Sequence, residues 1–253
     1  MSPEISFLHS NALDMFQTII RSIMCFVIAF TVMEATGEAS ESALRAGFAE
    51  RVIAPPGKQL DPCKARAVVL DDGTRRVALV GFDDIHIPRY AVLEIRQNVQ
   101  ERCDIDAGSI MIGASHTHTG GRIGLVRPQD VEGLDDLTKR LVDQGEEANL
   151  AKQQYVTFVI DQTVEAIVEA DANRTVVRIG FDSGREDKVS FNRRHHMKNG
   201  RTFTHPRQNN PEMLGYAGLI DPEVGVIGVW DKDGTLLGCV VNFACHATTT
   251  HGR

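Results

Sequence analysis

Short apolar runs alternate with polar turns along the chain, and the first of them predict a hairpin, a helix and a further strand. Residues 65–70 and 75–82 are rich in Val, Ala and Leu and flank the turn sequence "DDGT", which predicts a β-hairpin. A helix is predicted to begin at Pro88 and to end near Cys103, because its apolar residues recur at helical spacing. The apolar residues 109–115 predict the next strand, so this part of the chain has the pattern of a βαβ unit.

The second half of the chain adds another helix, another strand and a second hairpin. Apolar residues at helical spacing predict a helix over residues 155–170, and the run 174–181 predicts a strand. The polar, basic stretch 191–213 is rich in turn formers and is predicted to be a loop of the kind that carries function. The runs 224–230 and 235–244 flank "DKDG" and predict the hairpin. We therefore expect an α/β fold of mixed β-sheets with flanking helices.

The N-terminal residues have the layout of a secretory signal peptide. A single positive charge, Arg21, precedes an apolar run from Ile23 to Met33, and small residues follow it. The run is shorter than the about 20 apolar residues that a membrane-spanning helix needs, and it also fits a buried core helix. We predict that residues 1–39 are a leader for a secreted, periplasmic or otherwise extracytoplasmic protein, and we hypothesise that Met15 is the true start.

Composition and charge narrow the range of functions. The chain has 253 residues, a formal net charge of −7 and 42% hydrophobic residues, as expected of a globular protein. The negative charge, and the lack of a basic stripe with interleaved aromatic residues, predict that no nucleic acid is bound. Cys25 lies in the predicted leader, and the four cysteines that follow it are too few for a disulfide scaffold. Cys239 and Cys245 lie in an apolar run, which favours buried thiols.

Two histidines follow the strand 109–115, within the sequence "GASHTHTGG". If extended geometry continues past the strand, His116 and His118 point to the same side and both imidazoles approach one metal ion. The alternative is a polar turn whose hydroxyl groups bond the local backbone. Gly120 and Gly121 fit both interpretations, because they allow either a tight turn or the close approach of a substrate.

A third histidine, His246, ends a second apolar strand within "NFACHATTT". Ligands gather where strands end in α/β folds, and zinc takes three or four protein ligands. His116 and His246 are therefore candidate ligands, with His118 either a third ligand or a neighbouring base. Two interpretations of Arg193 and Arg194 stay open. They contact an oxyanion or a polar headgroup at the mouth of a site, or they are a pair of solvated surface side chains. The other histidines are weaker candidates: His86, His195, His196 and His205.

Several stretches resemble, in the same order, the neutral/alkaline (non-lysosomal) ceramidases. They are "AERVIAPPG", "ARAVVLDDGTRRVALVGFD", "IGASHTHTGG", "SFNRR" and "IDPEVGVIGVWDKDGTLLGCVVNFACHATT". The resemblance covers about residues 46–253 and corresponds to the N-terminal part of that family's catalytic domain. We accordingly place a partial ceramidase-like catalytic domain at residues 44–253.

The resemblance implies a zinc amidase that hydrolyses the N-acyl bond of ceramide to sphingosine and a fatty acid. Residue by residue, it implies zinc ligands at His116 and His246. It also implies an acid/base or transition-state role for His118 and a site-lining role for Arg193. Zinc would lower the pKa of a bound water and polarise the amide carbonyl. The implied partners are ceramide or a related N-acyl lipid, together with peripheral contact to a membrane surface.

Two features depart from the family's pattern. "SHTHTGG" stands where the family more often has Thr-His-Thr-His-Ser-Gly-Pro. The glutamate and the tyrosine that complete the family's zinc site come from well beyond the second histidine. We therefore expect an incomplete N-terminal part of a larger zinc-hydrolase domain. Two alternatives stay open: a zinc hydrolase of another N-acyl or ester substrate, and an inactive truncated copy.

Overall fold

The computed structural model describes residues 43–55, 57, 61–121, 123, 146–207 and 209–247. The predicted leader, residues 1–39, lies outside the described residues, and so does most of the polar stretch that precedes the second helix. Within the described ranges, neither helix has a stretch that is long and apolar enough to cross a membrane.

Residues 45–114, together with a short strand further along the chain, form a five-stranded sheet and its connections. The elements are β1 (Arg45–Val52), β2 (Lys64–Asp71), β3 (Arg76–Phe82), α2 (Arg89–Cys103), the 3-10 helix η2 (Ala107–Ser109), β4 (Ile110–Ala114) and β5 (Thr175–Val176). The strand order is β4-β3-β2-β1-β5. β2 and β3 form the predicted antiparallel hairpin, and β4 is parallel to β3, as the βαβ pattern predicts. β1 is not among the predicted strands, because its charged and small residues alternate only weakly.

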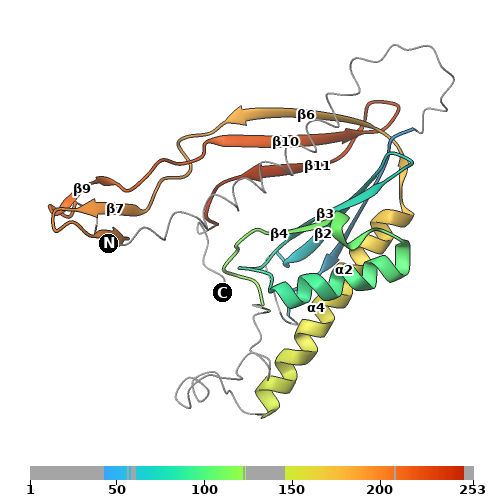
Figure 1. Cartoon of the computed structure of the whole chain (residues 1–253), viewed down its shortest axis with the longest axis horizontal. Coiled ribbons are helices and arrows are strands. Elements are labelled where there is room, and N and C mark those ends of the chain that lie inside the picture. Colours follow the sequence, from blue (N-terminus) through green and yellow to red (C-terminus); the bar gives the residue numbers. More distant parts are fainter. Residues whose placement is uncertain are drawn as a thin grey trace, which may run out of the picture. The chain divides into compact units, whose positions relative to one another are not determined.

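Two helices cover one face of this sheet (Figure 1). α4 (Glu146–Ala172) packs across β1 and β2, and α2 packs against α4. The core between the layers is apolar, with Phe82, Ile95, Ile110, Val159 and Ile167 among its fully buried side chains. α4 begins before the predicted start at residue 155. The hydrophobic pattern does not reveal this earlier start, because residues 150–154 are mostly exposed and carry no apolar stripe. They belong to residue types that favour helix without burial.

A second sheet contains the predicted C-terminal hairpin. It has three antiparallel strands in the order β11-β10-β6: β6 (Arg178–Arg185), β10 (Glu223–Trp230) and β11 (Leu236–Phe243). A small core of Ala46, Val177 and Val229 joins this sheet to the first. The contact is close, because a Cβ atom placed on Gly238 would lie 2.6 Å from the ring of Phe48. This packing sets where the end of β11 lies.

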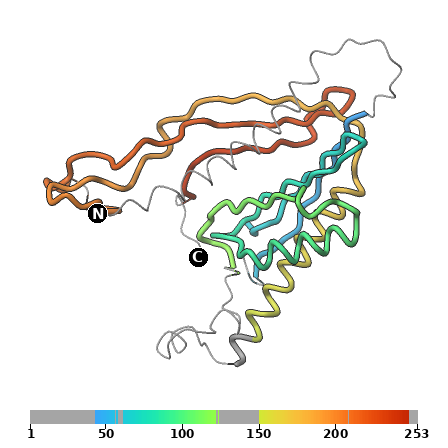
Figure 2. The backbone as a smooth tube through the Cα atoms, viewed as in Figure 1, coloured from blue at the N-terminus to red at the C-terminus, as the bar shows by residue number. Residues whose placement is uncertain are grey.

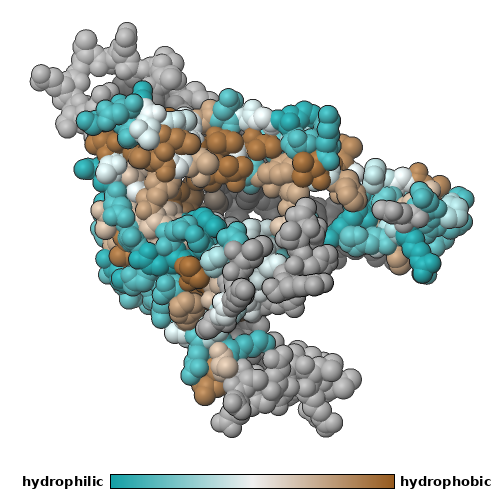
Figure 3. Space-filling view, turned by 180° about the vertical axis from the view of Figure 1, so that it is seen from behind, coloured by the Kyte–Doolittle hydropathy of each residue, from teal (hydrophilic) through white to brown (hydrophobic). Residues whose placement is uncertain are grey.

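The outer face of β11 is exposed, so the prediction of buried thiols is wrong. The exposed side chains of this face are Leu237, Cys239 and Val241, which alternate with residues that face the first sheet. Cys245, beyond the strand, is also exposed. A strand that is apolar on both faces is normally covered on both faces. In the part of the chain that the structure describes, only one face is covered. Figure 3 shows the apolar side chains that gather along this sheet.

The stretch 191–213, predicted to be a loop, contains strands and belongs to a third sheet. Its strands are β7 (Arg194–Met197), β8 (Thr202–Thr204) and β9 (Met213–Tyr216), in the order β8-β7-β9. They are only three or four residues long, and β7 and β8 are mostly polar, so their pairing depends on backbone hydrogen bonds and leaves no apolar alternation in the sequence. This third sheet continues the ends of β6 and β10 (Figure 2). Between them the Glu186 N–H donates to the carbonyl of Pro222 at 2.8 Å.

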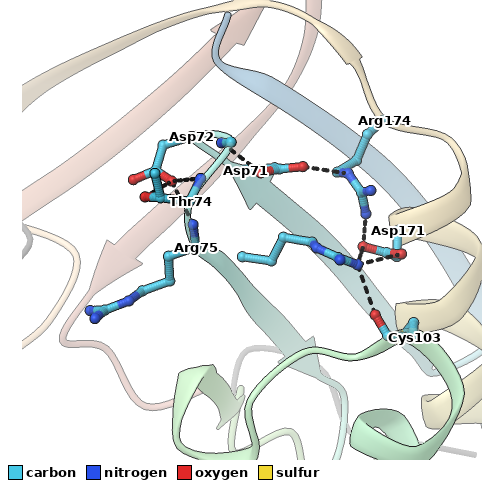
Figure 4. A network of polar contacts seen from close by, with 9 residues as sticks. Asp71, Asp72, Thr74, Arg75, Cys103, Asp171 and Arg174 are labelled. Atoms are coloured by element: carbon cyan, nitrogen blue, oxygen red, sulfur yellow. Dashed lines mark hydrogen bonds and ion pairs between the residues drawn. The ribbon is translucent and has the colours of Figure 1, made fainter. Parts of the chain in front are cut away.

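A network of charged side chains fastens the end of α4 to the β2–β3 hairpin (Figure 4). Arg76 donates to the carbonyl of Cys103 at 2.7 Å and lies 3.4 Å from the carboxylate of Asp171. Arg174 pairs with Asp171 and lies 3.1 Å from the carboxylate of Asp71. Because these groups are partly buried, salt screens them less than it screens an exposed pair.

Gly47 provides a test of how closely α4 packs on the sheet. A Cβ atom on Gly47 would overlap the carbonyl oxygen of Ala170 and lie 2.8 Å from the amide nitrogen of Arg174. We expect Gly47→Ala to lower the free energy of unfolding by about 1–3 kcal/mol, measured by urea denaturation. Gly81→Ala on β3 is the control, because a Cβ atom there meets nothing within 4 Å. Equal effects of the two substitutions would contradict the packing described.

Candidate metal centre

Three histidines from two different sheets come together. His116 and His118 follow β4 of the first sheet, and His246 follows β11 of the second. Ligand nitrogens of the three rings all lie within 4.8 Å of one another. The ring centroids are 4.6 Å apart for His116 and His246, 5.1 Å for His116 and His118, and 5.0 Å for His118 and His246. Among the described residues, no other group of three or more His, Cys, Asp or Glu side chains is arranged this way.

The backbone turns sharply at His116 instead of continuing the strand. Its φ is +59°, in the left-handed region that residues with a Cβ atom rarely adopt. The extended geometry expected beyond the strand is therefore absent, and His118 lies in the turn that follows. The two rings approach each other because the chain curls, not because they alternate on a strand. We call residues 115–121 the histidine loop.

The end of β3 anchors the histidine loop. The Ser115 N–H donates to the carbonyl of Phe82 at 2.9 Å, and the Ser115 hydroxyl donates to the carboxylate of Asp83 at 3.3 Å. His116 Nδ1 lies 2.6 Å from the carbonyl oxygen of Ile85. Since a carbonyl oxygen only accepts, Nδ1 carries a proton and Nε2 keeps its lone pair for a metal. Such a backbone contact is what usually orients a metal-binding histidine.

Gly120 and Gly121 allow the protein's own groups to approach the loop. A Cβ atom on Gly121 would overlap the hydroxyl of Tyr155, which donates to the carbonyl of Ile53 at 2.7 Å. A Cβ atom on Gly120 would lie 3.0 Å from the backbone oxygen of Asp83. Neither glycine has a positive φ. Close packing, rather than a tight turn, is therefore what requires small residues here. Burial raises the pKa of Tyr155 far above its usual value, so its hydroxyl stays protonated.

A buried thiol lies beneath the loop. Cys63 is buried in the main core and its side chain contacts Thr119 of the histidine loop. Burial, together with the negative charge of Asp83, raises the pKa of the Cys63 thiol. Cys63 is therefore a neutral packing residue beneath the loop, and it is not a member of the cluster formed by His116, His118 and His246.

Arg193 lies close enough to the cluster to affect it electrostatically. Desolvation lowers the pKa of His246, and the positive charge of Arg193 and the two other histidines lower it further. The neutral imidazole, which is the form that binds metal, is thereby favoured. Arg194, His195 and His196 lie instead on β7, and the His195 ring packs against Tyr216 with centroids 4.8 Å apart.

Sequence reasoning finds the three histidines but misses the residues that hold them. The side chains of Asp84 and Tyr155 and the carbonyl of Ile85 all contact or orient the histidine loop. Their sequence signal is weak: two carboxylates directly after a strand, in "FDDI", are the only visible cue. These carboxylates suggest a contact with the neighbouring His86. The contact that the structure shows at the metal centre instead joins His116 to the backbone carbonyl of Ile85.

Comparison with known proteins finds that the sequence and the fold of this chain are similar to those of ceramidases. No family model matches the chain. The chain is 24% identical over 192 residues to the neutral ceramidase of Pseudomonas aeruginosa. This alignment covers 73% of this chain and 25% of that protein. The crystal structure of neutral ceramidase from Pseudomonas aeruginosa matches with a TM-score of 0.56 at 20% identity, covering 84% of this chain and 33% of that one. A ceramidase complexed with C2 matches with a TM-score of 0.55 at 19% identity, covering 81% and 31%.

These matches confirm the resemblance and the fold class. The chain has the mixed-sheet α/β fold of part of the ceramidase structures. Its sequence resembles neutral ceramidase in particular. The chain spans between a quarter and a third of the length of these relatives. The roles of His116, His118, His246 and Arg193 stay predictions, although the structure places all four in one region.

Removing single histidines tests the metal centre. We expect His116→Ala and His246→Ala each to lower the affinity for zinc by about tenfold or more, because each removes one of few ligands. The measurement is the zinc content after dialysis, by mass spectrometry. His196→Ala is the matched control, since His196 is exposed on β7 outside the cluster. Undiminished zinc in both cluster variants would reject the site.

Proposed function

We propose that this chain is part of a zinc-dependent amidohydrolase that cleaves the N-acyl bond of ceramide or a closely related N-acyl lipid. The observation that carries the proposal is the convergence of three histidines from two sheets. The similarity to neutral ceramidase over 73% of the chain supports the substrate class. The products would be a sphingoid base and a fatty acid.

The donor set suits zinc. Imidazole nitrogens are common zinc ligands, and they bind in the neutral form. The contact to Ile85 leaves Nε2 of His116 free, and the lowered pKa of His246 favours its neutral form. His116 and His246 would hold the ion. Bound zinc would polarise the amide carbonyl and lower the pKa of a water molecule beside it.

His118 and Arg193 would carry out the remaining steps. The C–N bond of the amide breaks, so the departing nitrogen needs a proton, and the attacking water must lose one. His118 lies beside both other rings and is exposed, which suits a group that takes the proton from water and delivers it to nitrogen. Arg193 supplies a fixed positive charge for the polar head of the lipid or for the oxygen that becomes negative.

An assay of amide hydrolysis tests the function and separates the alternatives. We expect the chain, or the longer product if its gene continues in frame, to hydrolyse a short-chain ceramide. A zinc chelator should abolish the activity and added zinc should restore it. His118→Ala should lower kcat by about 10²- to 10⁴-fold while the zinc content stays unchanged.

The same assay includes the outcomes that would contradict the proposal. Hydrolysis of simple N-acyl amino acids or esters, but not of ceramides, would favour a different zinc hydrolase. Bound zinc without hydrolysis of any of these substrates would favour an inactive copy. His196→Ala again serves as the control, because it leaves the cluster intact.

We also propose that the third sheet contacts a lipid surface, where an N-acyl lipid would be found. Residues 191–220 contain five Arg and Lys and one Glu, a formal charge of +4 in a chain of net charge −7. Phe203 and Tyr216, each 60% exposed, pair across the sheet with His195 from opposite sides and so lie on one face. Strand pairing thus brings basic and aromatic residues together although they form no stripe along the sequence, and this combination is typical of lipid interfaces. Secretion by way of residues 1–39 stays a prediction as well.

Vesicle sedimentation tests this contact without any need for activity. We expect binding to phosphatidylcholine vesicles that contain phosphatidylglycerol, and release at high salt, because each basic residue near such a surface contributes about 1 kcal/mol. Phe203→Ser with Tyr216→Ser should weaken binding several-fold. Phe181→Ser is the control, since Phe181 is 56% exposed but lies on β6 outside the basic segment. Equal binding by all variants would contradict the proposal.

A further inference from the structure

Asp84 is a buried carboxylate directly after the end of β3. Its residue surface is 1% exposed, and it is the only acidic or basic residue classed as buried in the described part of the chain. The neighbouring Asp83 lies 2.6 Å from Arg66, whereas no ion pair involving Asp84 occurs among the described residues. A buried carboxylate is costly unless hydrogen bonds satisfy its oxygens. The hydrogen bonds it makes should therefore show what it does.

Both oxygens of Asp84 accept backbone N–H groups that flank the histidine loop. Oδ1 accepts from Ile85 at 2.6 Å, and Oδ2 accepts from Ile123 at 3.1 Å. The loop also lies directly on the carboxylate, since a Cβ atom on Gly120 would be 3.1 Å from Oδ1. The carbonyl of Ile123 in turn accepts from the hydroxyl of Tyr90 at 3.1 Å. One side chain thus joins the anchor of His116 to the exit of the loop.

We propose that Asp84 is a positioning residue for the metal centre. By holding the amide of Ile85, it limits rotation of the backbone whose carbonyl accepts the Nδ1–H of His116. By holding the amide of Ile123, it keeps the loop in the curl that brings His116 and His118 together. The ligands are then oriented before any metal binds. The inference rests on the proposed metal centre and does not depend on the substrate.

Two variants and a control separate positioning from general stability. Asp84→Ala removes both acceptors, and Asp84→Asn keeps the shape and one acceptor oxygen. Asp171→Asn is the control, because Asp171 is partly buried and paired with Arg76 and Arg174 in the network that fastens the end of α4. That substitution should destabilise the fold without reaching the histidine loop.

The first readout is the tautomer of His116 in the metal-free protein. It is measured by long-range nitrogen–proton NMR of the ¹⁵N-labelled full chain at a pH where the imidazoles are neutral. Loss of the signal in His116→Gln assigns it. We expect the Nδ1–H tautomer in the wild type and in Asp171→Asn, a mixture of tautomers in Asp84→Ala, and an intermediate result in Asp84→Asn.

The second readout is the dissociation constant for zinc, measured by competition with a chromophoric chelator. Loss of a group that orients a ligand typically weakens metal binding about 10- to 100-fold. We expect that range for Asp84→Ala, a smaller effect for Asp84→Asn, and a change within about twofold for Asp171→Asn.

An unchanged tautomer in both Asp84 variants would overturn the inference, as would an equal shift in Asp171→Asn. If Asp84→Ala does not fold, Asp84→Asn decides alone. A chain that hydrolyses no ceramide but shows the tautomer change would leave the inference standing while the proposed function fails.

Discussion

The hydrogen bond between Nδ1 of His116 and the carbonyl oxygen of Ile85 is the contact on which the metal centre depends. It determines which nitrogen of the ring carries a proton, and therefore which nitrogen remains for a metal. It also compensates for an unfavourable backbone, because a left-handed residue with a Cβ atom persists only where its surroundings hold it. Contacts from β3 and α4 supply those surroundings. Ser115 donates its N–H to the end of β3, and Gly121 packs against Tyr155 of α4. Asp84, directly after β3, accepts the N–H of Ile123 beyond the loop.

The second requirement is that two sheets pack closely enough to bring their strand ends together. His246 reaches the other histidines only because β11 lies against the first sheet, where Gly238 leaves room for the ring of Phe48. The core that joins the sheets is small, with three buried residues, whereas the core under α2 and α4 is extensive. The position of His246 therefore depends on fewer buried contacts than the position of His116 does.

One face of the second sheet is exposed in this chain. The chain spans about a third of the ceramidase structures it resembles. The second sheet has an outer face with exposed Leu237, Cys239 and Val241. A contiguous apolar face of this kind is usually covered by other protein in a complete fold. The third sheet differs, because basic residues stand among its exposed side chains Phe203, Leu214 and Tyr216.

Periodicity and turn chemistry by themselves determined both hairpins, the βαβ unit and the α/β class, because these depend on neighbours in the sequence. The sequence also singled out His116, His118 and His246, since each follows an apolar strand. Tertiary structure alone decided the left-handed curl at His116, the burial of Asp84 and the exposure of Cys239. Those features arise from contacts between residues far apart in the chain, such as Ile85 with His116. Tertiary structure also decided the short strands of the third sheet. Backbone hydrogen bonds hold these strands together, so the pattern of apolar and polar side chains does not predict them.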